Sequence, residues 1–347
     1  MAAKRRKKAK EGQKFEGLSA RIDADLYALV AEESDKKGLS MTWVLEDIIE
    51  QQLGDKGKEE TSETSTDNGP SPKRKAPTIL TVINFKGGVA KTTTTTSLAT
   101  CLGKLGKKVL VIDFDAQGNA SISFNVFDKK KKEPCIVDVL FASERGQEKM
   151  TLEEVMRGTA CQNVKVVPSN MRFLKADAMI RNENGSETLL QYAIQDLIDE
   201  GNENFDYIII DLGPNLNMTT TNALVAMEIG NENSMVILPV KLDEYSIVGI
   251  PEVVETIENV AKARRTRTQK WRILLTIVEP TTVAYDAALD ELQKEVPDAR
   301  YFETQIRKAT KVNEATLAKL PFSAYAPRTN AAKDYYSLAK EIETMHE

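Results

Sequence analysis

The chain has 347 residues, of which 41% are hydrophobic and 29% are charged, and its formal net charge at pH 7 is −5. This length predicts more than one domain, and no apolar run approaches the roughly 20 residues of a membrane span, so we expect a protein that stays in water. The single histidine, His346, and three widely spaced cysteines argue against a histidine-based catalytic triad, a zinc site and a disulfide scaffold. A reducing cytoplasm fits this cysteine usage best.

The N-terminal part of the chain divides into three segments by composition. Residues 1–16 begin "MAAKRRKKAKEGQK" and lead into no apolar stretch, so we expect a disordered basic arm rather than a secretory signal. Residues 17–53 open with alternating apolar and polar residues and continue at helical spacing, which predicts a strand and two helices. A unit this small needs a partner to bury enough surface, so we expect it to dimerise. Residues 54–77 are polar and rich in Ser, Thr, Gly and Pro, which predicts a linker.

From residue 78 to residue 347, short β-branched runs alternate with helical stretches. The alternation predicts an α/β fold, with a mostly parallel β-sheet flanked by helices and ligands bound at the carboxyl ends of the strands. The predicted strands cover residues 79–84, 108–113, 164–169, 207–211, 235–240 and 272–278.

The segment "FKGGVAKTT", residues 85–93, connects the first of these strands to a helix. Gly87 and Gly88 would let the backbone approach an anion, and the N-terminus of the helix adds amide donors. Lys91 would then contact the β- and γ-phosphates of a nucleotide, and Thr92 would ligate Mg²⁺. The alternative is a plain Gly-Gly turn with a solvated lysine, which the flanking strand and helix make improbable.

Three carboxylates follow strands that should end near this loop. Asp113 ends the strand 108–113 and Asp115 lies just beyond it, while Asp211 ends the strand 207–211. Any one of them could simply cap the next loop, but buried carboxylates are costly unless they are paired or close to a metal ion. Mg²⁺ with a nucleotide requires such oxygens around its water molecules.

Five ordered motifs together resemble the ParA-type partition ATPases of the ParA/MinD branch, over essentially all of residues 78–347. The motifs are "KGGVAKTT", "VLVIDFDAQGN", "YIIIDLGP", "VILPVKLDEYSIVGI" and "TQIRKATKVNEA" followed by "YAPRTNAAKDYYSLAKEI". The deviant phosphate-binding loop of that family reads K-G-G-x-x-K-[ST]. Phe85 is therefore outside the motif, and Lys86 is the signature lysine.

The resemblance implies a role for each matching residue. Lys86 reaches the phosphates of the facing subunit in an ATP-bound sandwich dimer, and Asp115 positions the attacking water. Asp113 supports the switch region and the water shell of the metal, and Asp211 lies on the Mg²⁺ side together with Thr92. The implied nucleotide contacts are Lys86, Gly87, Gly88, Val89, Ala90, Lys91, Thr92, Thr93 and Pro239.

Two positions depart from the family pattern. Ala90 stands where most members have glycine, and this should slow turnover if the position needs an unusual backbone angle. Gly213 replaces the first proline of the D-x-P-P segment, so the switch after Asp211 should be looser.

The resemblance also implies partners. ATP-bound members form dimers that bind DNA without sequence preference at the nucleoid, and a centromere-binding ParB-like protein stimulates hydrolysis and release. With a net charge of −5, DNA binding must come from local basic patches. One candidate patch, in "AKARRTRTQKWR", includes Arg264, Arg265 and Arg267, and a second consists of Arg307, Lys308 and Lys311. Either could instead be an ordinary solvated charged face.

Residues 17–53 resemble a ribbon-helix-helix domain, in which paired strands enter the DNA major groove. Ser19 and Arg21 would then face bases, and Ser40 would meet a phosphate. Acidic residues outnumber basic ones in this stretch, so a pure dimerisation device is the alternative.

Two other functions compete with partition. A MinD-like membrane-associated cell-division ATPase would need a basic amphipathic C-terminal helix, but "SLAKEIETMHE" is acidic at its end. A transcriptional repressor, in which the ATPase domain serves as a ligand-gated dimerisation module, stays open. A nitrogenase-reductase-like electron carrier would need bridging cysteines that the sequence does not match.

Overall fold

The structure is a computed structural model with two compact units, Met1–Pro72 and Lys73–Glu347. The boundary between the units falls inside the predicted linker. The residues that the structure describes are 13–14, 21–22, 75–141, 148–183, 185–265, 270–280 and 283–345.

In the first unit, the described residues form a short antiparallel ladder. Strand β1 (Gln13–Lys14) pairs with β2 (Arg21–Ile22), with Gln13 opposite Ile22. Strand β2 lies in the stretch for which the sequence predicts a strand, whereas β1 belongs to the predicted basic arm. Ser19, Ser40, the side chain of Arg21 and the two predicted helices lie outside the described residues.

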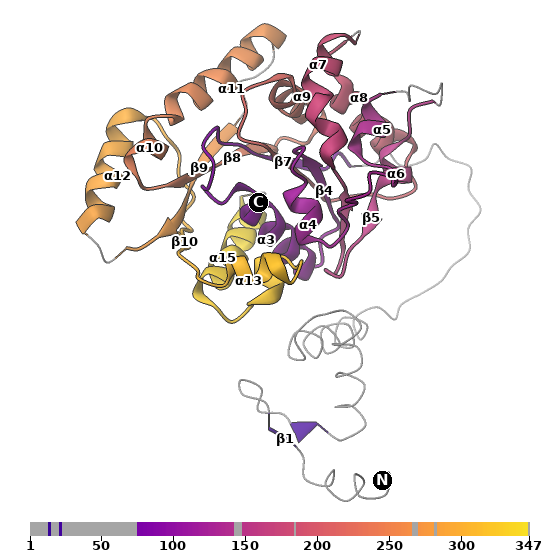
Figure 1. The fold of residues 1–347 in the computed structure, drawn as a ribbon. Helices are drawn as coiled ribbons and strands as arrows, with labels where there is room; N and C mark the ends of the chain where they lie inside the picture. The colour runs from indigo at the N-terminus through magenta and orange to yellow at the C-terminus, as the bar shows by residue number, and fades with distance from the viewer. Residues whose placement is uncertain are drawn as a thin grey trace, which may run out of the picture. The chain divides into compact units, whose positions relative to one another are not determined.

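The second unit is built on an eight-stranded sheet, with strand order β10-β9-β8-β3-β7-β4-β6-β5 (Figure 1). All neighbouring strands are parallel except β5, which runs antiparallel to β6. The strands are β3 (Thr78–Val82), β4 (Val109–Phe114), β5 (Arg157–Gly158), β6 (Val164–Val167), β7 (Tyr207–Leu212), β8 (Met235–Lys241), β9 (Lys270–Val278) and β10 (Ile306–Arg307). This architecture confirms the predicted fold class and all six predicted strands. Strands β5 and β10 have two residues each, too few for a periodic pattern to predict.

The sheet is apolar because both of its faces are covered. Along β7, Ile208 and Ile210 belong to one hydrophobic core, while Tyr207 and Ile209 belong to the other. Successive strand residues point to opposite faces, so a strand buried on both sides must be apolar throughout. The carboxyl edge of the sheet is therefore where polar groups can gather.

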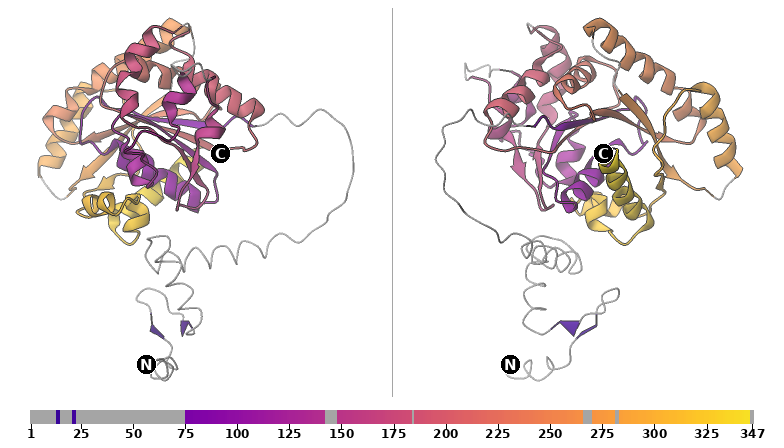
Figure 2. Two further views of the ribbon diagram at one scale, coloured as in Figure 1. Left: turned by 45° about the vertical axis from the view of Figure 1, so that its right-hand side comes forward. Right: turned by 180° about the vertical axis from the view of Figure 1, so that it is seen from behind.

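Helices pack on both faces (Figures 1 and 2). The face carrying the second core is covered by α3 (Lys91–Lys104), α4 (Asn119–Ser123), α13 (Val312–Leu317), α14 (Phe322–Tyr325) and α15 (Asn330–Thr344). The opposite face and its flank carry α5 (Ile136–Leu140), α6 (Leu152–Val155), η3 (Met171–Lys175), α7 (Ala176–Arg181), α8 (Leu189–Glu200), α9 (Met218–Ala226), η4 (Met227–Ile229), α10 (Glu244–Ile247), α11 (Ile250–Arg264) and α12 (Val283–Glu295).

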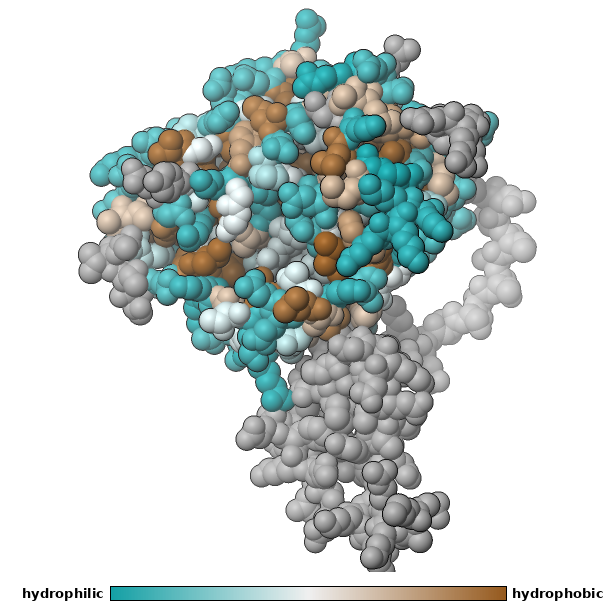
Figure 3. All heavy atoms as spheres, in the orientation of Figure 1, coloured by the Kyte–Doolittle hydropathy of each residue, from teal (hydrophilic) through white to brown (hydrophobic). Residues whose placement is uncertain are grey.

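Within the described residues, no helix has the length and apolar character needed to cross a membrane. On the face seen in Figure 1, hydrophilic residues surround separate groups of hydrophobic ones (Figure 3).

The C-terminal helix α15 contacts both α3, the helix after the predicted phosphate-binding loop, and β10, the strand at the edge of the sheet. Tyr335, fully buried, shares a 3.2 Å hydrogen bond with Thr94 of α3. The preceding residue, Asp334, accepts hydrogen bonds from Arg307 of β10. Two adjacent residues of one helix thus contact the helix that follows the central strand β3 and the edge strand β10.

Candidate nucleotide-binding site

The predicted phosphate-binding loop is the turn between β3 and α3, at the carboxyl end of a central strand. Neighbouring strands hold it in place. The Asn84 amide donates to the carbonyl of Pro239 in β8 at 2.9 Å and accepts from the backbone N–H of Lys86 at 2.8 Å. Thr276 of β9 donates to the carbonyl of Val89 at 3.1 Å. Pro239, predicted as a nucleotide contact, therefore also supports the loop through its backbone.

Lys91 begins α3 and lies across the loop. Its side chain is buried, with 8% of its surface exposed, and Nζ donates to the carbonyl of Lys86 at 2.7 Å. Burial lowers the pKa of Lys91, while nearby Asp211 and Asp115 act in the opposite direction. The first amides of α3 have no partner within the helix, so they and the ammonium group form an anion site of the kind found at helix N-termini.

Ala90 adopts a left-handed backbone conformation, with φ 66° and ψ 30°. This angle explains why the family favours glycine at the position, because a side chain makes the left-handed region unfavourable. Position 90 therefore has the unusual backbone angle on which the expectation of slower turnover depends.

Asp113 and Asp211 lie opposite each other on the adjacent strands β4 and β7, and both are fully buried. Asp211 accepts hydrogen bonds from the hydroxyls of Thr92 and Thr95, each at 2.8 Å. Asp113 accepts from the N–H of Ser121 at 2.7 Å and from its hydroxyl at 2.6 Å. Desolvation, together with the charge of Asp211, raises the pKa of Asp113 to about 8, and desolvation raises that of Asp211 to about 6.

Asp115 is half-buried beside this pair. Its Oδ1 accepts from the N–H of Gln117 at 3.0 Å. A Cβ placed on Gly213 would lie 3.2 Å from the Cγ and Oδ1 atoms of Asp115. The glycine that replaces the family's proline therefore leaves room for the carboxylate that is predicted to position water.

The residues at the start of α3 fit a nucleotide-bound Mg²⁺. Within the described residues, no group of three or more His, Cys, Asp or Glu side chains could hold a metal ion on its own. In nucleotide sites Mg²⁺ is held by one or two carboxylates, a hydroxyl, water and the phosphates. Asp211 supplies a carboxylate and Thr92, hydrogen-bonded to it, supplies a hydroxyl. A cation there would also reduce the cost of burying Asp211 and Asp113.

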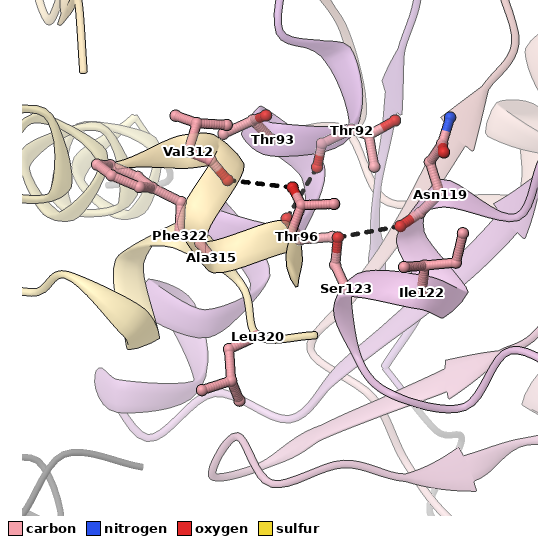
Figure 4. A pocket seen from close by; sticks show the side chains of 11 residues that line it. Thr92, Thr93, Thr96, Asn119, Ile122, Ser123, Val312, Ala315, Leu320 and Phe322 are labelled. Atoms are coloured by element: carbon pink, nitrogen blue, oxygen red, sulfur yellow. Dashed lines mark hydrogen bonds between the residues drawn. The ribbon is translucent and has the colours of Figure 1, made fainter. Parts of the chain in front are cut away.

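A cavity of about 190 Å³ lies beside the first turns of α3 (Figure 4). Only Thr92 and Thr93 of its lining were predicted from the sequence, because no local pattern links α3 to α4 or to the helices α13 and α14. Several of its hydroxyls bond to carbonyls of their own helices, such as Ser123 to Asn119 at 3.0 Å. The lining residues are Thr92, Thr93, Thr96, Asn119, Ile122, Ser123, Val312, Ala315, Thr316, Leu320 and Phe322.

The second predicted DNA patch is partly neutralised by acidic residues. The guanidinium of Arg307 binds both carboxylate oxygens of Asp334, at 2.9 and 2.5 Å. The ammonium of Lys308 lies 3.1 Å from Glu279. Lys311 is exposed at the N-terminus of α13. No local sequence pattern indicates these pairs, because each acidic partner is 27 or 29 residues away.

In the first predicted patch, Arg264 lies 3.3 Å from Glu228 of η4. Arg265 is the C-cap residue of α11, with φ 55°. Arg267 lies outside the described residues.

The chain is similar to known proteins in sequence and in fold. A family model described as an AAA domain matches residues 77–270. The sporulation initiation inhibitor protein Soj of Bacillus subtilis is 30% identical over 264 residues, which cover 76% of this chain and 97% of the relative. The chromosome partitioning protein ParA of Myxococcus xanthus is 26% identical over 76% of this chain and 87% of its own length. Cobyrinic acid a,c-diamide synthase from Mycobacterium smegmatis, crystallised with ADP and magnesium, has a similar structure, with a TM-score of 0.61 and 25% identity over 76% of this chain and 93% of its own.

Replacing Ala90 by glycine should stabilise the protein. A left-handed alanine costs about 1–2 kcal/mol, whereas the greater entropy of an unfolded glycine costs about 0.5–1 kcal/mol. We therefore expect Ala90→Gly to raise the free energy of unfolding by about 0.5–1 kcal/mol in a denaturant titration. The control is Ala287→Gly, an exposed position inside α12, which should lower it by about 1 kcal/mol. A loss of stability in Ala90→Gly would contradict the strain assigned to this residue.

Asp113 should make the nucleotide-free protein less stable as the pH rises. Its pKa of about 8 lies above the roughly 3.9 of an unfolded chain, so the folded state binds the extra proton. This contribution to stability is present at acidic pH and is lost as the pH rises toward 8. Asp113→Asn keeps an oxygen that can accept from Ser121 and carries no charge. The variant should melt at a higher temperature than the wild type at pH 8.

The melting-temperature difference for Asp113→Asn should shrink at pH 5, when both proteins are measured without nucleotide or Mg²⁺. Asp196→Asn, at an exposed position of α8, serves as the control and should show the same small difference at both pH values. If the melting temperatures of Asp113→Asn and the wild type differed by the same amount at pH 5 and pH 8, the carboxylate of Asp113 would not be protonated in the folded state.

Proposed function

This chain belongs to the family of ParA-type partition ATPases, and from that premise we propose that it binds and hydrolyses ATP with Mg²⁺ to drive DNA segregation. The observation that carries the proposal is the start of α3. There Lys91 lies across the loop and Thr92 is bonded to Asp211, next to the second buried carboxylate, Asp113. The cofactors are ATP and Mg²⁺.

Different residues of the chain have different roles in ATP hydrolysis. The amides of the loop and Lys91 bind the phosphates, and Thr92 with Asp211 holds the Mg²⁺ side. The bound cation neutralises charge that develops on the phosphates. Asp115 orients the attacking water, and Asp113 holds the start of α4 through Ser121. Catalysis of this kind depends on positioning and electrostatics.

The ATP-bound form is a dimer that closes over the carboxyl edge of the sheet. Lys86 is exposed on this edge and would reach the phosphates of the facing subunit. Exposed apolar residues follow the two strands that flank β3, with Leu216 after β7 (50% exposed) and Val248 after β8 (67%). A third, Leu174 (63%), follows β6. Apolar groups exposed beside a functional loop favour an interface there.

The dimer binds DNA without sequence preference in the cytoplasm, at the nucleoid, and a ParB-like centromere-binding partner stimulates hydrolysis and release. The basic patches around Arg264, Arg265 and Arg267 and around Arg307, Lys308 and Lys311 remain candidate contacts. The ion pairs of Arg307, Lys308 and Arg264 reduce their availability.

Two other functions are weaker candidates. The apolar side of α15 is packed in the core through Tyr335, Leu338 and Ile342, so this helix does not offer a membrane-binding face of the MinD type. A ligand-gated repressor would protect one operator in a footprinting experiment, whereas a partition ATPase covers any DNA when ATP is present.

The two lysines of the loop should have separable roles. Lys91→Ala removes the principal cation of the phosphate site and should abolish binding of a fluorescent ATP analogue. Lys86→Gln should keep that binding and lose ATP-dependent dimerisation in analytical ultracentrifugation. Lys175→Gln, an exposed lysine in η3, is the control and should behave as wild type in both assays. Normal ATP-dependent dimerisation of Lys86→Gln would refute the role of Lys86, and normal nucleotide binding by Lys91→Ala would refute the site itself.

We propose that the N-terminal unit adds operator DNA binding through Ser19, Arg21 and Ser40. Deleting residues 1–53 should remove preference for the protein's own promoter and keep ATP-dependent binding to random DNA, because the linker separates two folded units. The measurement is the ratio of the two affinities at matched salt. If the full chain already binds promoter and random DNA equally, the unit only dimerises the protein.

A further inference from the structure

Four consecutive lysines, Lys129–Lys132, occupy the connection between α4 and α5, and all four are exposed. We call them the lysine loop. None of the ion pairs found among the described residues involves them. They form a dense run of cations on a chain whose net charge is −5.

Hydrogen bonds give the lysine loop a defined conformation. The carboxylate of Asp128 accepts from the backbone N–H groups of Lys130 at 2.8 Å, Lys132 at 2.5 Å and Glu133 at 2.8 Å. Lys131 has a left-handed backbone with φ 54°, which completes the turn. The backbone therefore folds around Asp128, while the lysine side chains remain exposed.

A second contact closes the base of the loop. The guanidinium of Arg157, in β5, donates to the carbonyls of Val126 at 3.4 Å and Pro134 at 2.9 Å, one on each side of the lysines. Glu133 lies 3.7 Å from Arg157. The two acidic residues that flank the lysines in the sequence, Asp128 and Glu133, are thus engaged by backbone amides and by an arginine. Figure 3 shows a hydrophilic patch on the side of the molecule where Figure 1 labels α4 and β5.

We propose that the lysine loop is a DNA-binding surface that contacts the phosphate backbone without reading sequence. Lysine ammonium groups act as point charges on flexible stems, so they suit phosphate contacts and carry no base specificity. The proposal deepens the proposed function, because it assigns the DNA-binding step to a surface that neither predicted basic patch includes.

The lysine loop lies close to the candidate catalytic residues. The ring of Phe127, next to Asp128, packs so closely on Gly118 that a Cβ there would lie 2.4 Å from it. The N–H of Gly118 donates to the carbonyl of Asp115 at 3.0 Å. Two contacts therefore separate the lysine loop from the residue that is proposed to position water.

An anionic membrane surface is the other polyanion that lysines could bind. Segments that bind membrane surfaces combine basic residues with apolar side chains that enter the lipid. Among the described residues, the large exposed apolar side chains are Met171, Leu174, Tyr192, Leu216, Val248 and Leu317. None of them is in the connection between α4 and α5, so DNA is the favoured partner.

The test changes all four lysines of the loop to glutamine in the full chain. Binding to a random-sequence DNA duplex is measured with ATP and Mg²⁺ between about 50 and 200 mM salt, where phosphate contacts dominate the salt dependence. Each lost contact removes about 0.9 from the slope of log affinity against log salt, so four contacts would flatten it by about 3.6 per protomer. ATP binding and the ATPase rate without DNA should not change.

Two further variants control for charge and folding. Changing the four lysines to arginine keeps the charge and should keep the wild-type slope. A second quadruple glutamine variant removes the same charge from scattered exposed positions and should flatten the slope far less than the loop variant. Its positions are Lys149, Lys175, Lys294 and Lys333.

Equal slopes for the loop variant and the scattered variant would overturn the proposal while leaving DNA binding intact. Failure of the wild-type protein to bind the duplex at all would overturn both this proposal and the DNA-binding step of the proposed function. Loss of binding to phosphatidylglycerol vesicles in the loop variant, with DNA binding unchanged, would assign the lysine loop to a membrane surface instead.

Discussion

The burial of two carboxylates side by side at the ends of β4 and β7 is the constraint on which the nucleotide site depends. Asp113 and Asp211 are fully buried and occupy paired positions. Two adjacent anions in an apolar interior are costly unless donors and cations surround them. The hydroxyls of Thr92, Thr95 and Ser121 supply donors, yet the pKa of each carboxyl stays raised. A nucleotide-bound cation beside the pair would offset the remaining cost of burying both carboxylates.

The same constraint explains the surrounding architecture. Strand β7 lies between β3 and β4, so the carboxylates end next to the phosphate-binding loop. Lys91 links the loop to the buried carboxylates. Its side chain lies across the loop, and Asp211 is close enough to raise its pKa against the effect of burial. Helix α15 extends this network, because Tyr335 is bonded to Thr94 one turn along α3 while Asp334 binds Arg307 in β10. A change at the start of α3 thus has a short physical route to the edge of the sheet.

The parallel sheet and the central residues of the site could be predicted from the sequence, for a geometric reason. Parallel strands buried on both faces are apolar throughout, and their carboxyl ends share one edge, so the convergence of Lys91, Asp113 and Asp211 followed from order along the chain. The cavity beside α3 and the pairing of Arg307 with Asp334 did not follow. They depend on how α13, α14 and α15 pack, and no local periodicity encodes contacts between distant segments.

Cations that look equivalent in the sequence differ in what they lose on binding a polyanion. Arg307 is bound to an aspartate with 9% of its surface exposed, so moving the guanidinium to a phosphate would leave a nearly buried carboxylate without its partner. Lys308 would give up a more exposed pair, whereas Arg264 would leave Glu228, whose side chain is only 17% exposed. The lysine loop has no such cost, because Asp128 is already satisfied by backbone amides and Glu133 lies beside Arg157. In a chain with an excess of acidic residues, the cations that are free to exchange counterions for phosphates decide where a nucleic acid binds.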